Sequence, residues 1–270
     1  MIHALRRQAR IYGAFAAMAA KQALAYNYSV LVQYFLQILS MIIYIYFWRA
    51  VYSSATTLGG LTLTQTINYI LLARILAPLL NTYTIFSFGF RIRNGDFALE
   101  FVRPVDFLTR QYVEHLTGVG FFFVQAIPLF TLAWLAFGLQ LPASPAVWLA
   151  FAISVWLGQS ALFFFDWILA CLAFYTTETW GLTMVREGVA AFFSGALVPL
   201  AMMPGWLQQA ASAMPFAQAV AVPIALLSGL TPLADAPRVW LVQALWLVGL
   251  AVASRLIFNK AARQVTVQGG

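Results

Sequence analysis

Residues 29–52, SVLVQYFLQILSMIIYIYFWRAVY, contain a single charged side chain, that of Arg49 close to the end of the run. A helix needs about 20 consecutive apolar residues to cross the ~30 Å hydrocarbon core of a bilayer, and this stretch has that length. Backbone polar groups in lipid must pair within their own segment, so we expect a transmembrane helix here.

Five further stretches have the same character, at 66–88, 116–138, 146–174, 188–203 and 238–258. Of all residues 63% are hydrophobic and 9% are charged, whereas soluble domains carry about 25% charged residues. The expected fold is therefore an all-α integral membrane protein. One six-span transmembrane domain covers 28–260, and 261–270 form a cytoplasmic tail.

The first 27 residues are alanine-rich and basic, and we expect them to form an amphipathic helix on the membrane surface. The side chains available to lipid headgroups are Arg6, Arg7, Arg10 and Lys21. A signal peptide is the first alternative, but Lys21 and Asn27 interrupt the apolar run too early. A solvated tail is the second, and the apolar content of the segment disfavours it.

The basic residues predict the orientation, because lysine and arginine in short loops are retained on the cytoplasmic side. With the N-terminus inside, twelve of the 15 basic residues fall on cytoplasmic segments. These twelve are Arg6, Arg7, Arg10, Lys21, Arg91, Arg93, Arg103, Arg110, Arg186, Arg255, Lys260 and Arg263. Only Arg49 and Arg238 lie near outer ends, and Arg74 lies within a span.

Residues 204–235 are apolar but broken by prolines, so they are not expected to form one continuous helix. The prolines are Pro204, Pro215, Pro223 and Pro232. A full crossing here would move the basic C-terminus outside, whereas a hairpin keeps it inside. We expect two short helices on the outer side, at 206–213 and 216–228, with Pro215 at their junction. Such a hairpin needs protein or a cavity to cover its free backbone groups.

No group of residues in the sequence is arranged for catalysis or for metal binding. His3 and His115 have no cysteine or carboxylate at metal-ligand spacing. Asp166 and Glu178 are twelve residues apart, roughly 18 Å along a helix, which is too far for paired acid and base work. The single cysteine, Cys171, excludes an intrachain disulfide.

ATP hydrolysis by this chain is also excluded, because a phosphate-binding loop needs a lysine directly after a glycine. The only lysines are Lys21, which follows alanine, and Lys260, which follows asparagine. Any ATP-driven work therefore requires a second protein. The net charge of +7 does not indicate nucleic acid, since the basic residues are dispersed among apolar runs.

The most informative polar segment is the connection between the second and third spans, 89–115. Gly95 permits a tight turn, and Asp96 can cap a short helix with the sequence FALEFV. Pro104 ends that helix, and Asp106 can cap a second helix that leads into the third span. Such a short helix suits insertion into a groove on a partner, although an ordinary solvated connector is equally compatible with composition alone.

The motif IRNGDFALEFVRP at 92–104 resembles the loop of the type-2 ABC exporter permeases of the small six-span branch. That family also has a basic amphipathic N-terminal helix, six spans and a broken outer hairpin before the last span. The resemblance implies a non-enzymatic permease of the bacterial inner membrane, with both termini cytoplasmic. It also implies dimerisation with an identical or similar permease and binding of two cytoplasmic ATPase subunits, which hold the ATP and magnesium.

The resemblance makes the loop the coupling helix, which transmits ATP-driven closure of the ATPase subunits to the second and third spans. The residues assigned to it are Arg91, Gly95, Asp96, Phe97, Glu100, Phe101, Arg103 and Pro104. The outer hairpin, with Pro204, Pro215 and Pro223, would form the external gate.

Polar residues inside the spans are costly, about 2.5–3.5 kcal/mol for a charge on insertion scales. Arg74, Asp166 and Glu178 are the candidates, and Arg74 and Asp166 either face a substrate path or neutralise each other. Three further polar residues are expected to form interhelical hydrogen bonds, namely Asn81, Gln125 and Gln159. The aromatic residues are expected to be mostly lipid-facing or interfacial.

The substrate itself is not encoded in a recognisable motif, and few intramembrane charges favour an amphipathic or hydrophobic molecule. Two other functions are compatible with the composition. An ion-driven secondary transporter should show internal repeats, and none is evident between the two halves. A membrane scaffold without transport activity is the second alternative, and copurification of an ATPase would separate it from the permease.

Overall fold

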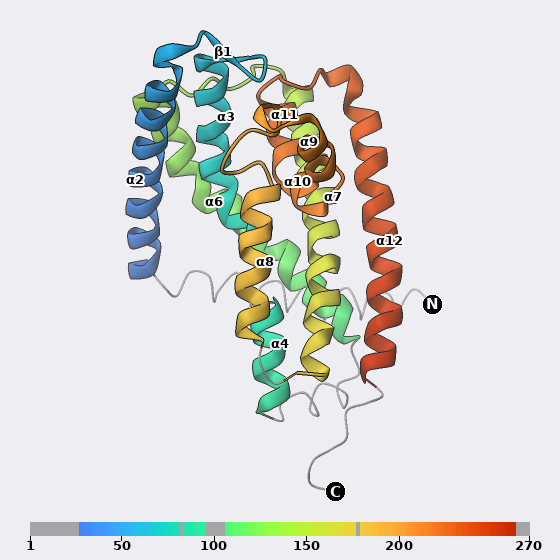
Figure 1. Cartoon of the computed structure of the whole chain (residues 1–270). Helices are drawn as coiled ribbons and strands as arrows, with labels where there is room; N and C mark the ends of the chain where they lie inside the picture. The colour runs from blue at the N-terminus through green and yellow to red at the C-terminus, as the bar shows by residue number, and fades with distance from the viewer. Residues whose placement is uncertain (1–26, 82–83, 95–105, 177–178, 263–270) are drawn as a thin grey trace, which may run out of the picture.

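A computed structural model describes residues 27–81, 84–94, 106–176 and 179–262 as a bundle of long helices (Figure 1). Helix α2 covers Asn27–Val51, α6 covers Phe107–Phe137, α7 covers Pro145–Ala170 and α12 covers Ala236–Ala262. Among the described residues, five helical segments are long and apolar enough to cross a membrane, or six if one bent pair counts as a span. The all-α membrane fold is therefore confirmed.

The second span is divided rather than continuous. Helix α3, Leu63–Leu76, passes through a 3-10 turn, η2 at Ala77–Leu80, and α4 follows at Thr84–Arg93. Pro78 lies at the start of η2, where its missing N–H costs little. The second span thus covers more residues than the single helix expected at 66–88, and it is interrupted near its middle.

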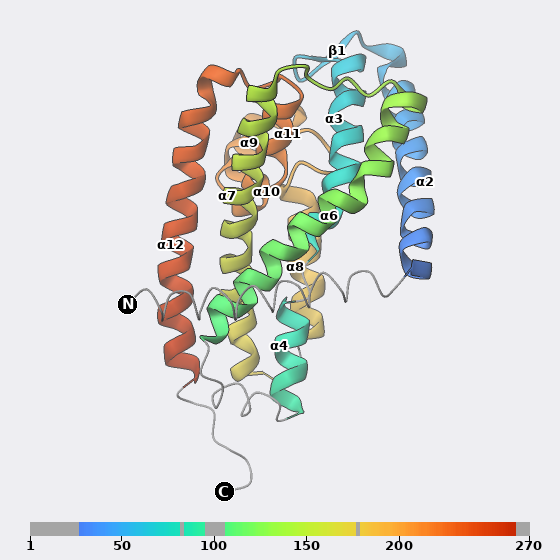
Figure 2. The same cartoon turned by 180° about the vertical axis from the view of Figure 1, so that it is seen from behind.

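The two ends of the bundle differ in content, as Figures 1 and 2 show from opposite sides. We call the end where α4 stops, α6 begins and α12 stops the loop end. We call the other end, with the residues 204–235, the hairpin end. The described helices alternate between these ends in the order that the sequence predicts.

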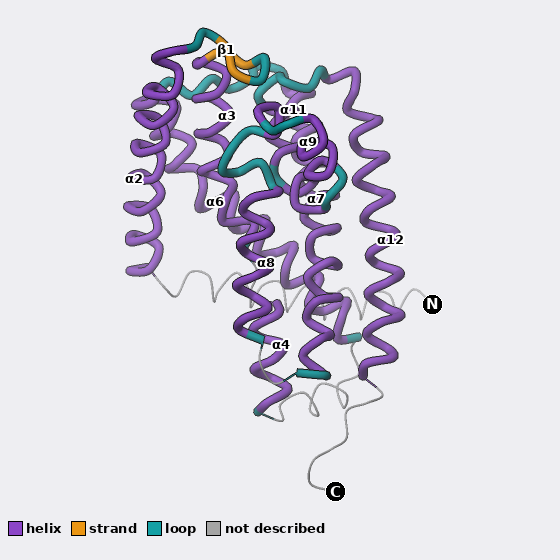
Figure 3. The backbone as a smooth tube through the Cα atoms, in the orientation of Figure 1, coloured by secondary structure: helices purple, strands orange, loops and turns teal. Residues whose placement is uncertain are grey.

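Short elements close the hairpin end, and the only described strands are there (Figure 3). Strands β1, Thr57–Leu58, and β2, Leu61–Thr62, pair antiparallel around Gly59 and Gly60, which both have positive φ. A side chain at Gly59 would lie 2.4 Å from the carbonyl oxygen of Ala201, so this turn packs directly on the 3-10 turn η4, Leu200–Met202.

The remaining 3-10 turns are η1 at Tyr52–Ser54, η3 at Cys171–Phe174 and η5 at Leu233–Asp235. The hairpin consists of α9, Gly205–Ser212, α10, Pro215–Ala219, and α11, Ala221–Leu227. The axis bends by 67° between α9 and the later pair. Prolines occupy the positions before or within the first turn of each short helix, where they are tolerated.

Helix α7 is the central element, packed against α12, α10, α11, α4 and α6. A large apolar core joins α2, α3, α6, α7 and the hairpin, and a second core lies at the loop end. Peripheral faces of α2, α6 and α12 remain apolar and exposed, as expected for surfaces that meet lipid.

The fifth span differs from the expectation. Helix α8 covers Trp180–Phe193, not 188–203, so Arg186 lies within a helix and not on a connection. Its 14 residues reach only about 21 Å, which is less than the ~30 Å of hydrocarbon. Irregular backbone from Ser194 to Pro199 continues the path. Arg186 does not mark the cytoplasmic end of a span, because its charge is paired with a buried acidic side chain that is described next.

Candidate functional site

A buried ion pair joins α7 to α8 in the interior of the bundle. The guanidinium of Arg186 donates two hydrogen bonds of 2.7 Å to the two carboxylate oxygens of Asp166, and both side chains are 1% exposed. Its Nη1 also donates to the backbone carbonyl of Leu80 at the end of η2. Asp166 is therefore neutralised by Arg186, and the alternative in which it pairs with Arg74 is wrong.

Arg74 instead supports the irregular backbone that follows α8. Its Nη2 donates to the carbonyl oxygen of Ala196, and its guanidinium lies 4.4 Å from the ring centre of Tyr44 on α2. One turn earlier on α3, the hydroxyl of Tyr69 donates to the carbonyl oxygen of Gly195 over 3.0 Å. Carbonyls freed where α8 ends thus find partners on α3, as backbone at membrane depth requires.

A cavity of about 290 Å³ lies between α2, η2 and α8, with the Arg74 side chain in its wall. Its apolar lining residues are Leu36, Ala77, Pro78, Leu80, Ala190, Ala191, Ala196 and Leu197. Its polar lining residues are Gln37, Ser40, Arg74, Asn81, Arg186 and Glu187. The mixture of apolar wall and a few charged and amide groups is typical of a small-molecule site.

Three groups in this cavity lack partners within the described part of the chain. Nε of Arg74 and Oε1 of Gln37 are buried without a hydrogen bond. The carboxylate of Glu187 takes part in none of the ion pairs found there, which are Arg110–Glu114, Arg186–Asp166 and Arg255–Asp106. The cavity wall therefore holds Arg186, which is paired with Asp166, and also a cation and an anion, Arg74 and Glu187, that have no counter-ion among the described residues.

Side-chain amides satisfy the broken backbone of the hairpin. Nε2 of Gln243 on α12 donates to the carbonyl oxygen of Gln218 over 2.8 Å and to the hydroxyl of Ser154 over 2.9 Å. Nε2 of Gln159 on α7 donates to the carbonyl oxygen of Ala219 over 3.2 Å. The expected interhelical hydrogen bond of Gln159 is present, whereas Asn81 lines the cavity. A side chain at Gly158 would lie 2.2 Å from the Gln218 oxygen, so the hairpin rests directly on α7.

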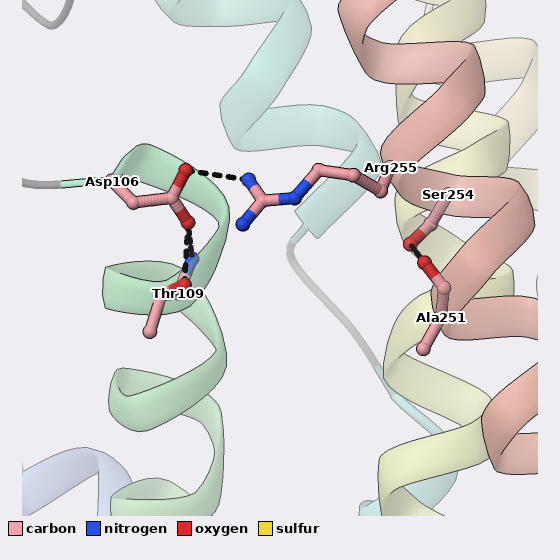
Figure 4. A network of polar contacts seen from close by, with 5 residues as sticks. All are labelled: Asp106, Thr109, Ala251, Ser254 and Arg255. Atoms are coloured by element: carbon pink, nitrogen blue, oxygen red, sulfur yellow. Dashed lines mark hydrogen bonds and ion pairs between the residues drawn. The ribbon is translucent and has the colours of Figure 1, made fainter.

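At the loop end, Asp106 caps α6 and also binds α12 (Figure 4). One carboxylate oxygen accepts from the backbone N–H and hydroxyl of Thr109, at 2.8 and 2.5 Å. The other accepts from Nη1 of Arg255 at 2.5 Å. Partial burial alone would raise the pKa of Asp106, but the hydrogen bonds from Arg255 and Thr109 and the Arg255 charge outweigh it, so the pKa lies below the ordinary 3.8. The predicted cap is present, together with an ion pair that the sequence does not indicate.

An aromatic cluster packs behind this ion pair and joins four helices. Trp167 of α7 is fully buried, with ring centres at 5.2 Å from Phe88 of α4, 5.4 Å from Phe107 of α6 and 5.4 Å from Phe258 of α12. These rings are not lipid-facing, so they are exceptions to the expectation that most aromatic residues face lipid or the interface. The ends of α4 and α6 are therefore connected to α7 and α12, and a displacement of the first two helices acts on the other two.

Most of the proposed coupling residues lie outside the described residues. Arg91 is on the last turns of α4, with its guanidinium 5.9 Å from the ring centre of Phe107. The others that the structure does not describe are Gly95, Asp96, Phe97, Glu100, Phe101, Arg103 and Pro104, and the same holds for Glu178. Pro204 and Pro215 start α9 and α10, and Pro223 lies in the first turn of α11.

Histidine and cysteine form no metal centre in the part of the chain that the structure describes, since no group of three His, Cys, Asp or Glu side chains could hold an ion there. His115 is half-buried on α6, with its ring centre 5.2 Å from that of Phe163. Cys171 is buried. Neither residue faces the cavity.

Comparison with known proteins gives one match. The model of the family described as ABC-2 family transporter protein matches residues 38–269, which include every described helix except the first turns of α2. No curated protein and no solved structure matches the chain.

Proposed function

The chain belongs to the ABC-2 family of transporter proteins and is a multi-pass membrane permease, and from this premise we propose that it is one transmembrane subunit of an ATP-driven exporter. The family match over residues 38–269 is the observation that carries the proposal. We propose two cytoplasmic ATPase subunits and a second permease, identical or similar, as its partners. ATP and magnesium would be held by the ATPase subunits, since no lysine of this chain follows a glycine.

The charge distribution supports a cytoplasmic loop end. The described basic residues at that end include Arg91, Arg110, Arg255 and Lys260, whereas Arg49 and Arg238 are at the hairpin end. Cationic residues in short segments are retained in the cytoplasm during insertion. We therefore place the loop and the C-terminus inside, the N-terminus with them, and the protein in the bacterial inner membrane.

Force from the ATPase would enter through the loop between α4 and α6. In this proposal, closure of the ATPase subunits displaces the helix near Gly95, and the attached helices move as levers. The aromatic cluster around Trp167 and the ion pair of Asp106 with Arg255 support this, because they tie the helices on both sides of the loop to α7 and α12. ATP must bind one arrangement more tightly than the other, and the loop conveys that difference.

The cavity beside Arg74 and the hairpin would form the substrate path and its outer gate. The cavity is lined by α2, α3, η2, α8 and the irregular backbone after α8, and its wall is largely apolar. A molecule with an apolar part entering from the bilayer suits such a wall better than a polar polymer does. Export of an amphipathic molecule is the direction and class that we propose.

The first test is copurification. A tagged chain, expressed with its own operon neighbours and solubilised in mild detergent, is expected to bring an ATPase with it. Reconstituted in vesicles, the complex should hydrolyse ATP, and a chain that purifies without any nucleotide-hydrolysing subunit would contradict the proposal.

The second test is a double alanine variant, Glu100→Ala with Arg103→Ala. We expect transport per ATP hydrolysed to fall about tenfold or more while membrane insertion is unchanged, because the charges that hold the loop in its groove are lost. The control is Arg49→Ala with Arg238→Ala, two exposed charges that lie outside residues 204–235 and outside the loop. Equal transport by the two double variants would refute the coupling assignment.

A further inference from the structure

The cavity beside Arg74 is lined by two charged side chains, Arg74 and Glu187, that have no counter-ion among the described residues. A charge in the hydrocarbon region is costly, and most such charges pair with each other or mark a substrate path. Arg186 and Asp166 follow the first pattern, with two 2.7 Å contacts. Arg74 and Glu187 line the same cavity and follow the second pattern, that of charges that mark a substrate path.

Arg74 has unused capacity to donate hydrogen bonds. A guanidinium has five N–H donors, and the one hydrogen bond found for Arg74 goes from Nη2 to the carbonyl of Ala196. Nε is without an acceptor, and the Tyr44 ring contributes only a cation–π contact. The α3 side of the cavity is therefore suited to an anionic group that accepts from a guanidinium.

Acceptors are unused on the other walls. Glu187 on α8 lines the cavity without an ion-pair partner in the described ranges, and Oε1 of Gln37 on α2 is buried without a donor. Both groups suit a cationic group that carries N–H donors. Arg74 and Glu187 line the same cavity and form no ion pair with each other, so one ligand in the cavity can meet both charges.

The apolar lining of the cavity suits the apolar part of an amphipathic ligand. Leu36 on α2 lines the cavity and is 55% exposed, so part of the apolar lining reaches the surface of the bundle. Acyl or other apolar chains can lie there while the head enters. We infer that the cavity binds a zwitterionic amphipath, with its anionic group at Arg74 and its cationic group at Glu187.

This inference rests on the proposed transport function for its purpose, but its test does not need the ATPase. The chain alone, purified in detergent, is titrated with three lipids of equal acyl chains and analysed by native mass spectrometry. The lipids are dioleoyl phosphatidylethanolamine, which is zwitterionic, dioleoyl phosphatidylglycerol, which is anionic, and dioleoyl dimethylammonium propane, which in its protonated form is cationic and keeps an N–H donor. We expect retention of the zwitterion to exceed that of either other lipid.

Charge neutralisation should shift the preference in opposite directions. Glu187→Gln leaves Arg74 alone and should favour the anionic lipid, and Arg74→Gln leaves Glu187 alone and should favour the cationic lipid. Each change should weaken zwitterion binding about tenfold or more, as expected for a charge-assisted contact. Controls are Arg238→Gln and Asp235→Asn, exposed charges at the hairpin end that should change nothing.

Two further measurements keep the inference open to refutation. Arg74 also donates to the carbonyl of Ala196, so a misfolded Arg74→Gln would be replaced by Arg74→Lys, which keeps the charge and should keep the zwitterion preference. Glu187→Gln removes no hydrogen bond or ion pair found among the described residues. Free glycerophosphoethanolamine should compete weakly, because it leaves the apolar wall unused.

Several results would overturn the inference. They are equal retention of all three lipids by the unmodified chain, the same shift in the controls as in the cavity variants, and full competition by the soluble head. Disulfide formation between two copies carrying Glu187→Cys would assign this carboxylate to a contact between permeases instead. Failure to copurify an ATPase would leave the lipid result intact and affect only the proposed function.

Discussion

Removing one charge of the Asp166–Arg186 pair is expected to destabilise the bundle far more than removing both charges. Both side chains are 1% exposed, so Asp166→Leu leaves a buried guanidinium with no counter-ion. Loss of one partner from a buried ion pair costs about 3–5 kcal/mol, whereas apolar replacement of the whole pair is often neutral or better. Arg186→Met should be the worse single change, because it also removes the donor to the Leu80 carbonyl, worth about 1–3 kcal/mol.

The assay is a double-mutant cycle of unfolding free energies, measured by circular dichroism during titration with sodium dodecyl sulfate in mixed micelles. We expect the double variant to be less destabilised than the sum of the singles by about 2 kcal/mol or more. The same cycle on Asp106→Leu and Arg255→Met is the control, since those side chains are 38% and 45% exposed and such pairs contribute less than about 1 kcal/mol. Additive effects at Asp166 and Arg186 would refute the reasoning.

Three further predictions concern the hairpin and the loop end. Gln243→Leu should cost about 1–3 kcal/mol in the same titration, because it leaves the Gln218 carbonyl buried without a donor; an unchanged unfolding midpoint would contradict it. Gly158→Ala should loosen the hairpin and speed its proteolysis, since the new Cβ meets the backbone at 2.2 Å, whereas Gly249→Ala meets nothing within 4 Å and should be silent. Asp106→Asn should cost the same stability at about pH 7 and pH 5, because the lowered pKa keeps the carboxylate ionised across that range. Its stabilising effect should disappear only as the pH falls below the ordinary 3.8, so a loss near pH 5 would be inconsistent with the ion pair.

The first and last spans and the start of the hairpin were predictable because two strong constraints act on the sequence, whereas the expected second hairpin helix, 216–228, is two helices, α10 and α11. Hydrocarbon thickness fixes the length of an apolar run, and α2 and α12 begin and end within a few residues of the expected bounds. Proline fixes where a helix can begin, so Pro204 and Pro215 mark the starts of α9 and α10. Neither constraint requires knowledge of neighbouring helices.

The interior polar contacts could not be predicted, since they depend on which helix faces which. A lone arginine in an apolar run indicates a span boundary until its partner is known, and the partner of Arg186 is 20 residues away on another helix. The same holds for the rings around Trp167, because a helix rotation decides whether a phenylalanine meets lipid or protein. The sequence did contain one signal for this ion pair. Asp166 and Arg186 are opposite charges in apolar runs that follow each other along the chain, and this could have predicted their pairing.

The coupling residues between Gly95 and Pro104 remain predictions from the loop motif, since they lie outside the described residues. The structure adds the contacts made by the helices on either side of this segment, α4 and α6. The cap of α6 at Asp106 was expected from the sequence alone, whereas its contact with Arg255, 149 residues later, required the packed arrangement of α6 and α12.

The central position of α7 has a consequence for how the protein responds to the thickness of its bilayer. In its most apolar window 67% of the residues are buried by protein, against 17% for each of α2, α6 and α12. A thinner or thicker bilayer acts on surfaces that touch it, and helices accommodate such mismatch by tilting. The peripheral helices would therefore adjust while α7 keeps its orientation. Brominated lipids should accordingly quench Trp134 on α6, which is 58% exposed, and spare Trp167.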